Sequence, residues 1–314
     1  MTWALANMLG TLVAMVVDRL WGEPPSRVHP VVAMGRYLGW MGPALTTLPP
    51  TLALWGGMLA WLAGACVVLA LGLAVEVGLR WSAMQLDAPD SVRVLLMGLS
   101  LGLLFKPLLA WRMLRDEVWD VEQALGRSLP AGREQLKRLV SRDVTQLDEA
   151  MVRESAIESL AENLNDSVVA PLFWFALGGL PAAALYRFAN TADAMWGYRG
   201  RYEWAGKWAA HLDDVLSWLP ARLTSGMLCL AAGRWPGWTA MRVQSGLTPS
   251  PNGGWPMGTM ALLLPVCLRK PGVYVLNDGA PAPQRRHTQQ ALSWAERAAW
   301  LAAALSGLMA LRFQ

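Results

Sequence analysis

The chain alternates long apolar stretches with shorter polar runs. The two strongest apolar stretches are residues 51–79 and 92–109, and residues 52–75 carry no charge. A helix crosses a bilayer with roughly 20 consecutive apolar residues, so both stretches predict membrane-spanning helices. Weaker apolar stretches, several short or broken by Pro and Gly, lie at residues 3–17, 168–186, 215–232, 257–268 and 298–311. The pattern predicts an all-α, polytopic integral membrane protein with about 4–6 membrane helices, a re-entrant helical hairpin and a cytoplasmic helical insertion.

The polar insertion covers residues 112–167 within a single membrane-embedded domain of residues 1–314. Its basic density near the ends of predicted spans favours the cytoplasmic side. These basic residues are Arg112, Arg115, Arg127, Arg133, Lys137, Arg138, Arg142 and Arg153. Residues 139–165 have helical spacing, which predicts one helix with an apolar face. That face consists of Leu147, Ala150, Ile157, Ala161 and Leu164.

The stretch 168–186 reads VVAPLFWFALGGLPAAALY, with Gly178, Gly179 and Pro181 near its centre. Gly-Gly followed by Pro interrupts a helix. Each half is only about nine residues long, too short to cross a bilayer. We therefore expect a re-entrant hairpin with both ends cytoplasmic, which would bring the polar runs on its two sides together. The alternative is a single kinked span, because Pro and Gly are common in membrane helices.

Composition supports the membrane assignment. Charged residues make up 16% of the chain and hydrophobic residues 54%, whereas a soluble domain carries about 25% charged residues. The net charge is +4. The sequence has neither a basic patch nor a nucleic-acid-binding motif, so we expect no nucleic-acid partner. The N-terminal stretch lacks a basic region before it and predicts a retained helix. Cys66, Cys229 and Cys267 form no CxxC pair, which predicts neither a zinc site nor a disulfide framework.

A strip of carboxylates recurs at every fourth position, which places its members on one side of a helix. Its members are Glu154, Glu158, Glu162 and Asp166. Like charges at this spacing repel by roughly 0.2–0.5 kcal/mol per pair, and no Lys or Arg lies between Arg153 and Arg187 to relieve the repulsion. A divalent cation is the simplest compensation, since carboxylates together with substrate phosphates suit Mg²⁺. The alternative is a solvated acidic face.

Two further runs place arginines next to apolar sequence. Residues 190–201 read NTADAMWGYRGR, and Arg199 and Arg201 there suit phosphate or carboxylate in fork geometry. Arg222 follows Asp213 and Asp214 inside an apolar run, where a charge normally faces a protein cavity. The alternatives are ordinary positive-inside flanking and helix-start acids with a snorkelling arginine.

Residues 250–256 read SPNGGWP and predict a tight turn followed by a helix, with Pro256 in its first turn. A helix N-terminus offers backbone N–H groups to an anion, although a plain interhelical turn has the same pattern. Near the N-terminus, residues 18–36 predict a loop stiffened by prolines. We expect His29 there to be a structural residue and not a general base.

These runs, in this order, resemble the CobD/CbiB family, the adenosylcobinamide-phosphate synthases of cobalamin biosynthesis. The resemblance covers nearly the whole chain, with DRLWGEP at 18–24, HPV at 29–31, MGR at 34–36, SRD at 141–143, ESLAENLNDSVVAPLF at 158–173, NTADAMWGY at 190–198, DD at 213–214, PARLT at 220–224 and SPNGGWP at 250–256. The chain departs from the family pattern at Asn165, Ser167 and Ala194, and none of these departures removes a carboxylate.

The resemblance implies a multi-pass ligase of the inner membrane with its active site facing the cytoplasm. It implies that ATP and Mg²⁺ are used to join the free propionate of adenosylcobyric acid to (R)-1-amino-2-propanol O-phosphate or ethanolamine phosphate, through an acyl phosphate. The expected partners are the corrinoid, the amino-alcohol phosphate, the lipid bilayer and other late cobalamin-pathway membrane enzymes. The chain has no GxxxxGK[ST] loop, so ATP is held in another way.

The runs and the resemblance together assign three sets of residues. The catalytic set is Glu158, Glu162, Asn163 and Asp166. The set for ATP and substrate is Arg142, Asp143, Asn190, Asp193, Tyr198, Arg199, Arg222, Ser250, Asn252 and Trp255. The metal set is Glu158, Glu162, Asp166, Asp213 and Asp214.

Two other classes of function fit parts of the sequence. An AmpE-like membrane regulator or sensor should lack the full acidic set, which this chain keeps. A small-molecule transporter fits the broken helices and Arg222, but it should show inverted repeats, and the sequence shows none.

Overall fold

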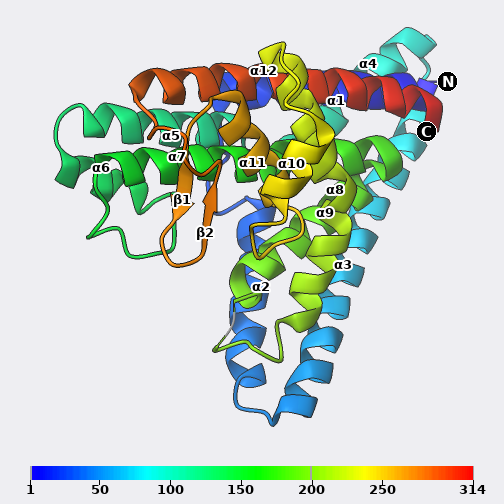
Figure 1. Cartoon of the computed structure of the whole chain (residues 1–314). Helices are drawn as coiled ribbons and strands as arrows, with labels where there is room; N and C mark the ends of the chain where they lie inside the picture. The colour runs from blue at the N-terminus through cyan, green and yellow to red at the C-terminus, as the bar shows by residue number, and fades with distance from the viewer. Residues whose placement is uncertain (1, 199, 314) are drawn as a thin grey trace. The chain divides into compact units, whose positions relative to one another are not determined.

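A computed structural model describes residues 2–198 and 200–313 (Figure 1). Within these residues the fold is helical apart from one antiparallel pair of short strands, β1 (Leu268–Lys270) and β2 (Tyr274–Leu276). The helices are α1 (Thr2–Trp21), α2 (Pro30–Leu45), α3 (Pro50–Gln85), α4 (Asp90–Phe105), the 3₁₀ turn η1 (Lys106–Leu108), α5 (Trp111–Leu125), α6 (Leu129–Leu136), α7 (Glu149–Leu164), the π-helical turn η2 (Asn165–Val169), α8 (Ala170–Trp196), α9 (Lys207–Ala232), α10 (Trp238–Ser245), α11 (Gly254–Leu263) and α12 (Arg285–Phe313).

Five helical runs of the described chain are long and apolar enough to cross a membrane: Thr2–Trp21, Pro50–Gln85, Asp90–Leu125, Glu149–Trp196 and Lys207–Ala232. The large apolar side chains of α3, such as Leu59, Leu71 and Val77, are exposed, as expected of a helix that faces lipid. The prediction of an all-α polytopic membrane protein is confirmed. The stretch 257–268 is not a span, because α11 ends at Leu263 and the chain then turns at Pro265 into β1.

The contacts divide the chain into two compact units, which we describe separately. Unit 1 comprises residues 1–110, 170–216 and 303–314, and unit 2 comprises residues 111–169 and 217–302. The predicted insertion 112–167 corresponds almost completely to the first segment of unit 2. The second segment was not predicted from the sequence, because its apolar stretches look like further membrane sequence. The prediction of a single domain stays a prediction.

In unit 1, α1 packs against α4 along small residues (Figure 1). A Cβ atom on Gly98 would lie 2.6 Å from Leu9 Cδ2, and one on Gly102 would lie 2.5 Å from Val13 Cβ. Only glycine therefore allows this approach of the two helices, a common arrangement between membrane helices. Deeper in the unit, the rings of Phe105 and Phe175 stack with centroids 4.0 Å apart.

A buried ion cluster ties together the predicted N-terminal loop of unit 1. Lys106 Nζ lies 3.1 Å from Asp18 Oδ1 and 2.9 Å from Glu23 Oε1. His29 Nε2 lies 2.9 Å from Glu23 Oε2, and its Nδ1 accepts a hydrogen bond from Val31 N at the start of α2. His29 is therefore the N-cap of α2, which confirms its expected structural role.

The predicted interruption at Gly178 and Gly179 is present, because both residues leave the helical conformation inside α8. The arms are longer than predicted, however. Helical structure begins at Glu149, far before residue 168, and α8 continues to Trp196. Polar side chains such as Asn165 and Asn190 lie inside helical runs and do not end them. The argument from short arms was therefore wrong, and the side of the membrane on which each arm ends stays a prediction.

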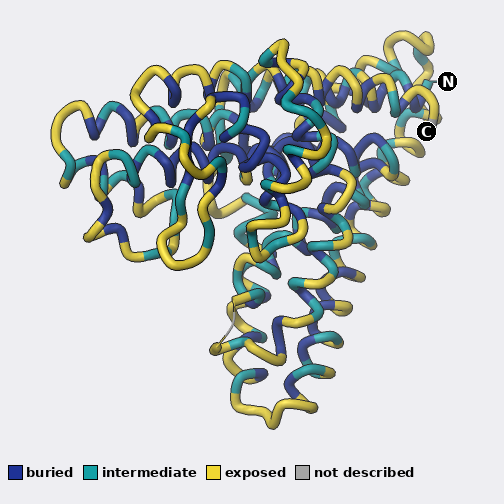
Figure 2. Tube along the Cα trace, in the orientation of Figure 1, coloured by how far each residue is buried: buried dark blue, intermediate teal, exposed yellow. Residues whose placement is uncertain are grey.

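In unit 2, α7 is buried along most of its length (Figure 2). It begins at Glu149 and not at residue 139, so the predicted long helix is wrong in its first part. Asp143 instead folds the chain back, accepting hydrogen bonds from Thr145 N at 2.9 Å and Thr145 Oγ1 at 3.0 Å. Asp148 Oδ1 then accepts from Met151 N at 2.8 Å and is the N-cap of α7.

Candidate functional site

The carboxylate strip lies on α7 as predicted, but its members differ sharply in exposure. Glu154 and Glu158 are buried, whereas Glu162 is exposed. A buried carboxylate requires a cationic or hydrogen-bonding partner. The structure supplies these partners from outside the helix. Glu154 and Glu158 are therefore compensated, although no Lys or Arg follows them in the sequence before Arg187.

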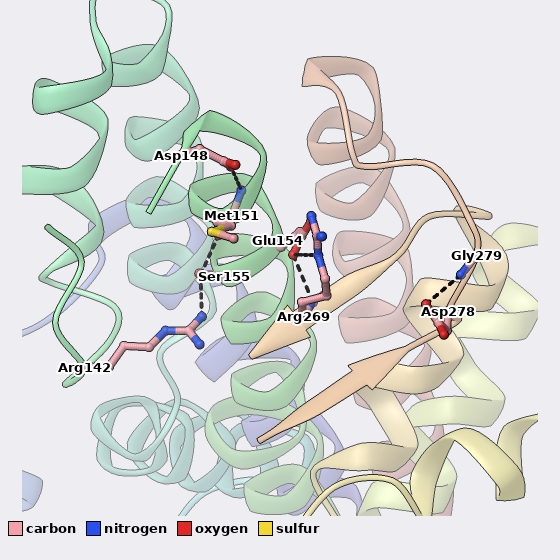
Figure 3. Close-up of polar contacts among 8 residues, drawn as sticks. All are labelled: Arg142, Asp148, Met151, Glu154, Ser155, Arg269, Asp278 and Gly279. Carbon is pink, nitrogen blue, oxygen red and sulfur yellow. Dashed lines mark hydrogen bonds and ion pairs between the residues drawn. The ribbon is translucent and has the colours of Figure 1, made fainter. Parts of the chain in front are cut away.

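Glu154 is paired with Arg269 of β1 (Figure 3). Arg269 Nη2 donates to Glu154 Oε1 at 2.7 Å, and the backbone N of Arg269 donates to Oε2 at 3.1 Å. Glu154 is fully buried. The hydrogen bonds that Arg269 donates to the Glu154 carboxylate raise the pKa of its guanidinium, which stays charged. This pair fixes β1 against α7.

Glu158 is paired with Arg142, which reaches α7 from the preceding loop. Arg142 Nη2 donates to Glu158 Oε2 at 3.4 Å. It also donates to Ser155 Oγ (Figure 3). Two buried nitrogens of Arg142, Nε and Nη1, have no hydrogen-bond partner within the described chain, and the buried Oε1 of Glu158 has none besides the nearby hydroxyl of Tyr274. Buried polar atoms are rarely left unpaired in native proteins, so these atoms are open to a water molecule or to a ligand.

Tyr274 of β2 lies close to the same carboxylates. Burial raises the pKa of its phenol, and the carboxylates of Glu158 and Glu162 raise it further. The phenol therefore stays protonated at neutral pH and offers a donor next to the acidic strip. Its hydroxyl lies 3.6 Å from Met257 Sδ of α11, so Tyr274 connects the strip with that helix.

Glu162 lies against the turn that precedes α11. A Cβ atom on Gly253 would be 3.0 Å from Glu162 Oε1. Glycine at this position thus lets the exposed carboxylate approach the first turn of α11, where negative charge is favoured. Asn163 points elsewhere, since its Nδ2 donates to Ser159 O in the same helix at 2.9 Å.

The π-helical turn η2 carries the end of the acidic run. Asn165 Nδ2 donates to Asp166 Oδ1 at 2.8 Å, and Asn165 Oδ1 accepts from Thr224 Oγ1 of α9 at 3.1 Å. Asn165 and Thr224 are buried. Short π-helical segments are frequent at functional sites. Here the segment brings the predicted metal ligand Asp166 next to the run 220–224.

Arg222 contacts the predicted turn 250–256 directly. Its Nη1 donates to Asn252 Oδ1 at 2.8 Å and to Trp218 O at 2.7 Å. Its guanidinium lies over the Trp255 ring, 4.9 Å from the ring centroid. The structure therefore joins Arg222, Asn252, Ser250 and Trp255, which the sequence placed in separate runs. The backbone N–H groups of Asn252 and Gly253 donate to Ser250 Oγ, so these two are not free for an anion.

The remaining predicted residues belong to unit 1. Asn190 Oδ1 accepts from Arg187 Nη1 at 3.4 Å, and Asp193 lies on the same helix, α8. Tyr198 is exposed, and Asp213 is buried on α9. Asp214 follows Asp213 on α9, and Arg199 lies outside the described residues. The convergence of these residues with the strip on α7 stays a prediction.

The oxygen donors of the acidic strip decide whether a Mg²⁺ ion fits here. The described residues contain no group of three or more His, Cys, Asp or Glu side chains that could hold a metal ion by themselves. Mg²⁺, however, usually binds one or two carboxylates, with water and substrate phosphates completing its shell. The carboxylates of buried Glu158 and of exposed Glu162, one helical turn further on, are hard oxygen donors of this kind. The residues of unit 2 therefore fit a Mg²⁺ ion that arrives with a phosphate substrate.

Sequence reasoning missed two residues of this site, Arg269 and Tyr274. Both lie on the short strands that follow α11, where the apolar stretch 257–268 suggested a weak span. The signal that was present is the Pro265 break followed by the basic pair Arg269–Lys270. Such a sequence is a poor continuation of a membrane helix.

Comparisons with known proteins agree with this arrangement of motifs. A family model described as CobD/Cbib protein matches residues 11–303. A cobalamin biosynthesis protein CobD from Chromobacterium violaceum is 38% identical over 94% of this chain and 94% of its own length. One of the same name from Stutzerimonas stutzeri is 36% identical over 96% of this chain and 98% of its own, and one from Dehalococcoides mccartyi is 35% identical over 85% of each. No solved structure matches the chain. On the family model and these relatives, which cover nearly all of its length, this chain belongs to the CobD/CbiB family.

Proposed function

We propose that this protein is an adenosylcobinamide-phosphate synthase. It joins the free propionate of adenosylcobyric acid to (R)-1-amino-2-propanol O-phosphate or ethanolamine phosphate in an ATP-dependent amide ligation. The observation that carries the proposal is the pair of buried Glu158 and half-buried Arg142, in which Nε and Nη1 of Arg142 have no partner within the described chain, beside the exposed Glu162. All three residues lie in runs that match the family motifs.

The chemistry requires activation of the carboxylate, because a carboxylate and an amine do not condense at neutral pH. In the proposed sequence, a propionate oxygen attacks the γ-phosphorus of ATP, the bond to the bridging oxygen breaks, and ADP leaves. The amine nitrogen then attacks the carbonyl carbon of the acyl phosphate. The carbon–oxygen bond to phosphate breaks, inorganic phosphate leaves, and the nitrogen loses one proton to form the amide.

The residues of unit 2 suit this chemistry. Phosphoryl transfer depends on positioning and on charge neutralisation more than on a nucleophilic side chain. Arg142 offers two unpaired, buried N–H donors for an anionic group. Glu158 and Glu162 would supply carboxylate oxygens to a Mg²⁺ ion whose remaining ligands come from water and substrate phosphates, and this ion would neutralise phosphate charge. Tyr274 keeps its proton and supplies a neutral donor beside these acids.

The location and partners belong to the same proposal. The protein acts in the inner membrane with its site facing the cytoplasm, where ATP is present. Its substrates are the corrinoid and the amino-alcohol phosphate, and it associates with other membrane enzymes of late cobalamin synthesis. The basic residues of the run 112–153 favour this orientation.

One assay tests the proposal. The purified protein in detergent is mixed with adenosylcobyric acid, amino-alcohol phosphate and Mg²⁺-ATP, and the products are measured by mass spectrometry and by ADP release. We expect one ADP for each amide formed. Without the acid, no ADP should be released. Without the amine, ADP release should stop after a single turnover, when the acyl phosphate has formed. Complete reaction mixtures that yield no amide would refute the proposed function.

A further inference from the structure

Unit 2 contains a pocket of about 390 Å³ beside the turn that precedes α11. Two guanidinium groups line it, Arg222 from α9 and Arg242 from α10, together with Thr248, Ser250 and Trp255. All of its lining residues are described, and none of them is an Asp or Glu. A pocket with two arginines and no carboxylate attracts an anion, since nothing in its wall neutralises them.

Arg222 is held in a fixed orientation in this wall. Besides its bonds to Asn252 and Trp218, its Nη2 donates to Pro251 O at 3.3 Å. The guanidinium also lies over the Trp218 ring, with its centroid 4.5 Å away. These contacts use aromatic faces and neutral oxygens, which leave the positive charge of Arg222 in place. Arg222 therefore contributes a preorganised cation.

Arg242 differs, because its side chain is exposed and forms no ion pair or hydrogen bond in the described chain. It lies on α10, one turn before Ser245, which also lines the pocket. A guanidinium has five N–H donors that match the oxygens of a phosphate. Arg242 is thus free to bind a phosphate that enters the pocket from solution.

The turn 250–256 separates two sites of opposite charge in unit 2. Arg222 and Ser250 line the pocket, whereas Glu162 lies against Gly253 of the same turn. A nucleotide carrying Mg²⁺ requires carboxylate ligands for its metal, and the acidic strip supplies them. The pocket supplies none and therefore suits a phosphate group without a metal ion.

We propose that this pocket binds the phosphate group of a small, metal-free phosphomonoester, and that Arg242 is its principal free ligand. This inference rests on the proposed ligase function for the identity of the occupant, which is then the amino-alcohol phosphate and not ATP. The ester phosphate does not react in the ligation, so holding it leaves the amine free to attack. Arg242 is a binding residue that the sequence runs did not single out.

The first test measures binding without turnover. Ethanolamine phosphate and inorganic phosphate are titrated into the full-length protein in detergent, without nucleotide or Mg²⁺, by isothermal titration calorimetry. Arg242→Gln should weaken both affinities at least 10-fold, and Arg242→Lys should restore part of the loss. Arg234→Gln is the matched control, because Arg234 is exposed in the same unit but does not line the pocket. Equal affinities in the Arg242→Gln and Arg234→Gln variants would overturn the proposal.

The second test separates the two phosphate sources by steady-state kinetics. Arg242→Gln should raise KM for the amino-alcohol phosphate at least 10-fold and leave KM for ATP unchanged. A rise confined to KM for ATP would overturn the assignment to the amino-alcohol phosphate. If the wild type forms no amide but its phosphate affinity still depends on Arg242, the ligase proposal fails while the phosphate pocket stands.

Discussion

Glu76 caps the broken helix in unit 1 through a single hydrogen bond to Leu180. The backbone N of Leu180 donates to Glu76 Oε1 at 2.6 Å, and Glu76 is buried in the C-terminal part of the apolar helix α3. Gly179, which precedes Leu180, has φ +64°. A Cβ atom at Gly179 would lie 2.0 Å from Glu76 Oε1. The break in α8 and the acid on α3 therefore depend on each other.

Gly179→Ala should destabilise the protein by about 1–3 kcal/mol or more, because it adds backbone strain to the clash with Glu76. The effect is measured as a lower midpoint of thermal unfolding in detergent. Gly78→Ala is the matched control, since Gly78 lies in α3 with no neighbouring atom within 4 Å of an added Cβ. That control should be neutral or slightly stabilising. Equal midpoints for the two variants would contradict the proposed dependence.

The Glu154–Arg269 pair gives a second stability prediction. Arg269→Gln leaves Glu154 buried without its cation and should cost about 3–5 kcal/mol, toward the lower figure because the Arg269 side chain is 39% exposed. Glu154→Gln combined with Arg269→Gln should recover a large part of this loss, since no buried charge remains. The comparison is a double-mutant cycle of unfolding free energies. A double variant less stable than Arg269→Gln alone would show that the pair is not the cause.

Much of the membrane fold follows from local sequence. The uncharged stretch 52–75 is long enough to span by itself, and the Gly178–Gly179 break was visible as a helix interruption. The start of α7 was not predicted, because Leu147 fits the apolar periodicity although the chain there is a loop. The helix begins after Asp148, because the Asp148 side chain accepts a hydrogen bond from Met151 N and caps the first turn.

The acidic residues of the candidate site could be predicted from the sequence, whereas their pairing with arginines could not. The spacing placed Glu154, Glu158 and Glu162 on one helix, which the structure confirms. The counterions could not be predicted, because Arg269 is 115 residues from Glu154 along the chain. Glu154, which the sequence did not assign to the metal set, is compensated by this arginine through tertiary packing.

The orientation of the helical run 149–196 gives a third prediction. If the chain turns back within the membrane at Gly178–Gly179, both ends of the run are cytoplasmic and its two flanks react from the same side. Single cysteines at Gln146 and Glu203, which are both exposed, are introduced into a background lacking Cys66, Cys229 and Cys267.

An impermeant thiol reagent is then applied to intact cells and to inverted vesicles. Both cysteines should be labelled only in inverted vesicles, where the cytoplasmic face is outside. Labelling of Glu203→Cys in intact cells would show that the run 149–196 crosses the membrane and would contradict the re-entrant hairpin.

The central claim is that the acidic strip on α7 performs the ligation, and Glu162→Gln tests it most directly. Glu162 is exposed, so its neutral isostere should leave the unfolding midpoint unchanged. The rate of amide formation with Mg²⁺-ATP, measured beside the wild type, should fall at least 100-fold, since a carboxylate that binds Mg²⁺-phosphate is lost. Turnover within a few-fold of the wild type, at an unchanged unfolding midpoint, would contradict the assignment of the strip as the catalytic site.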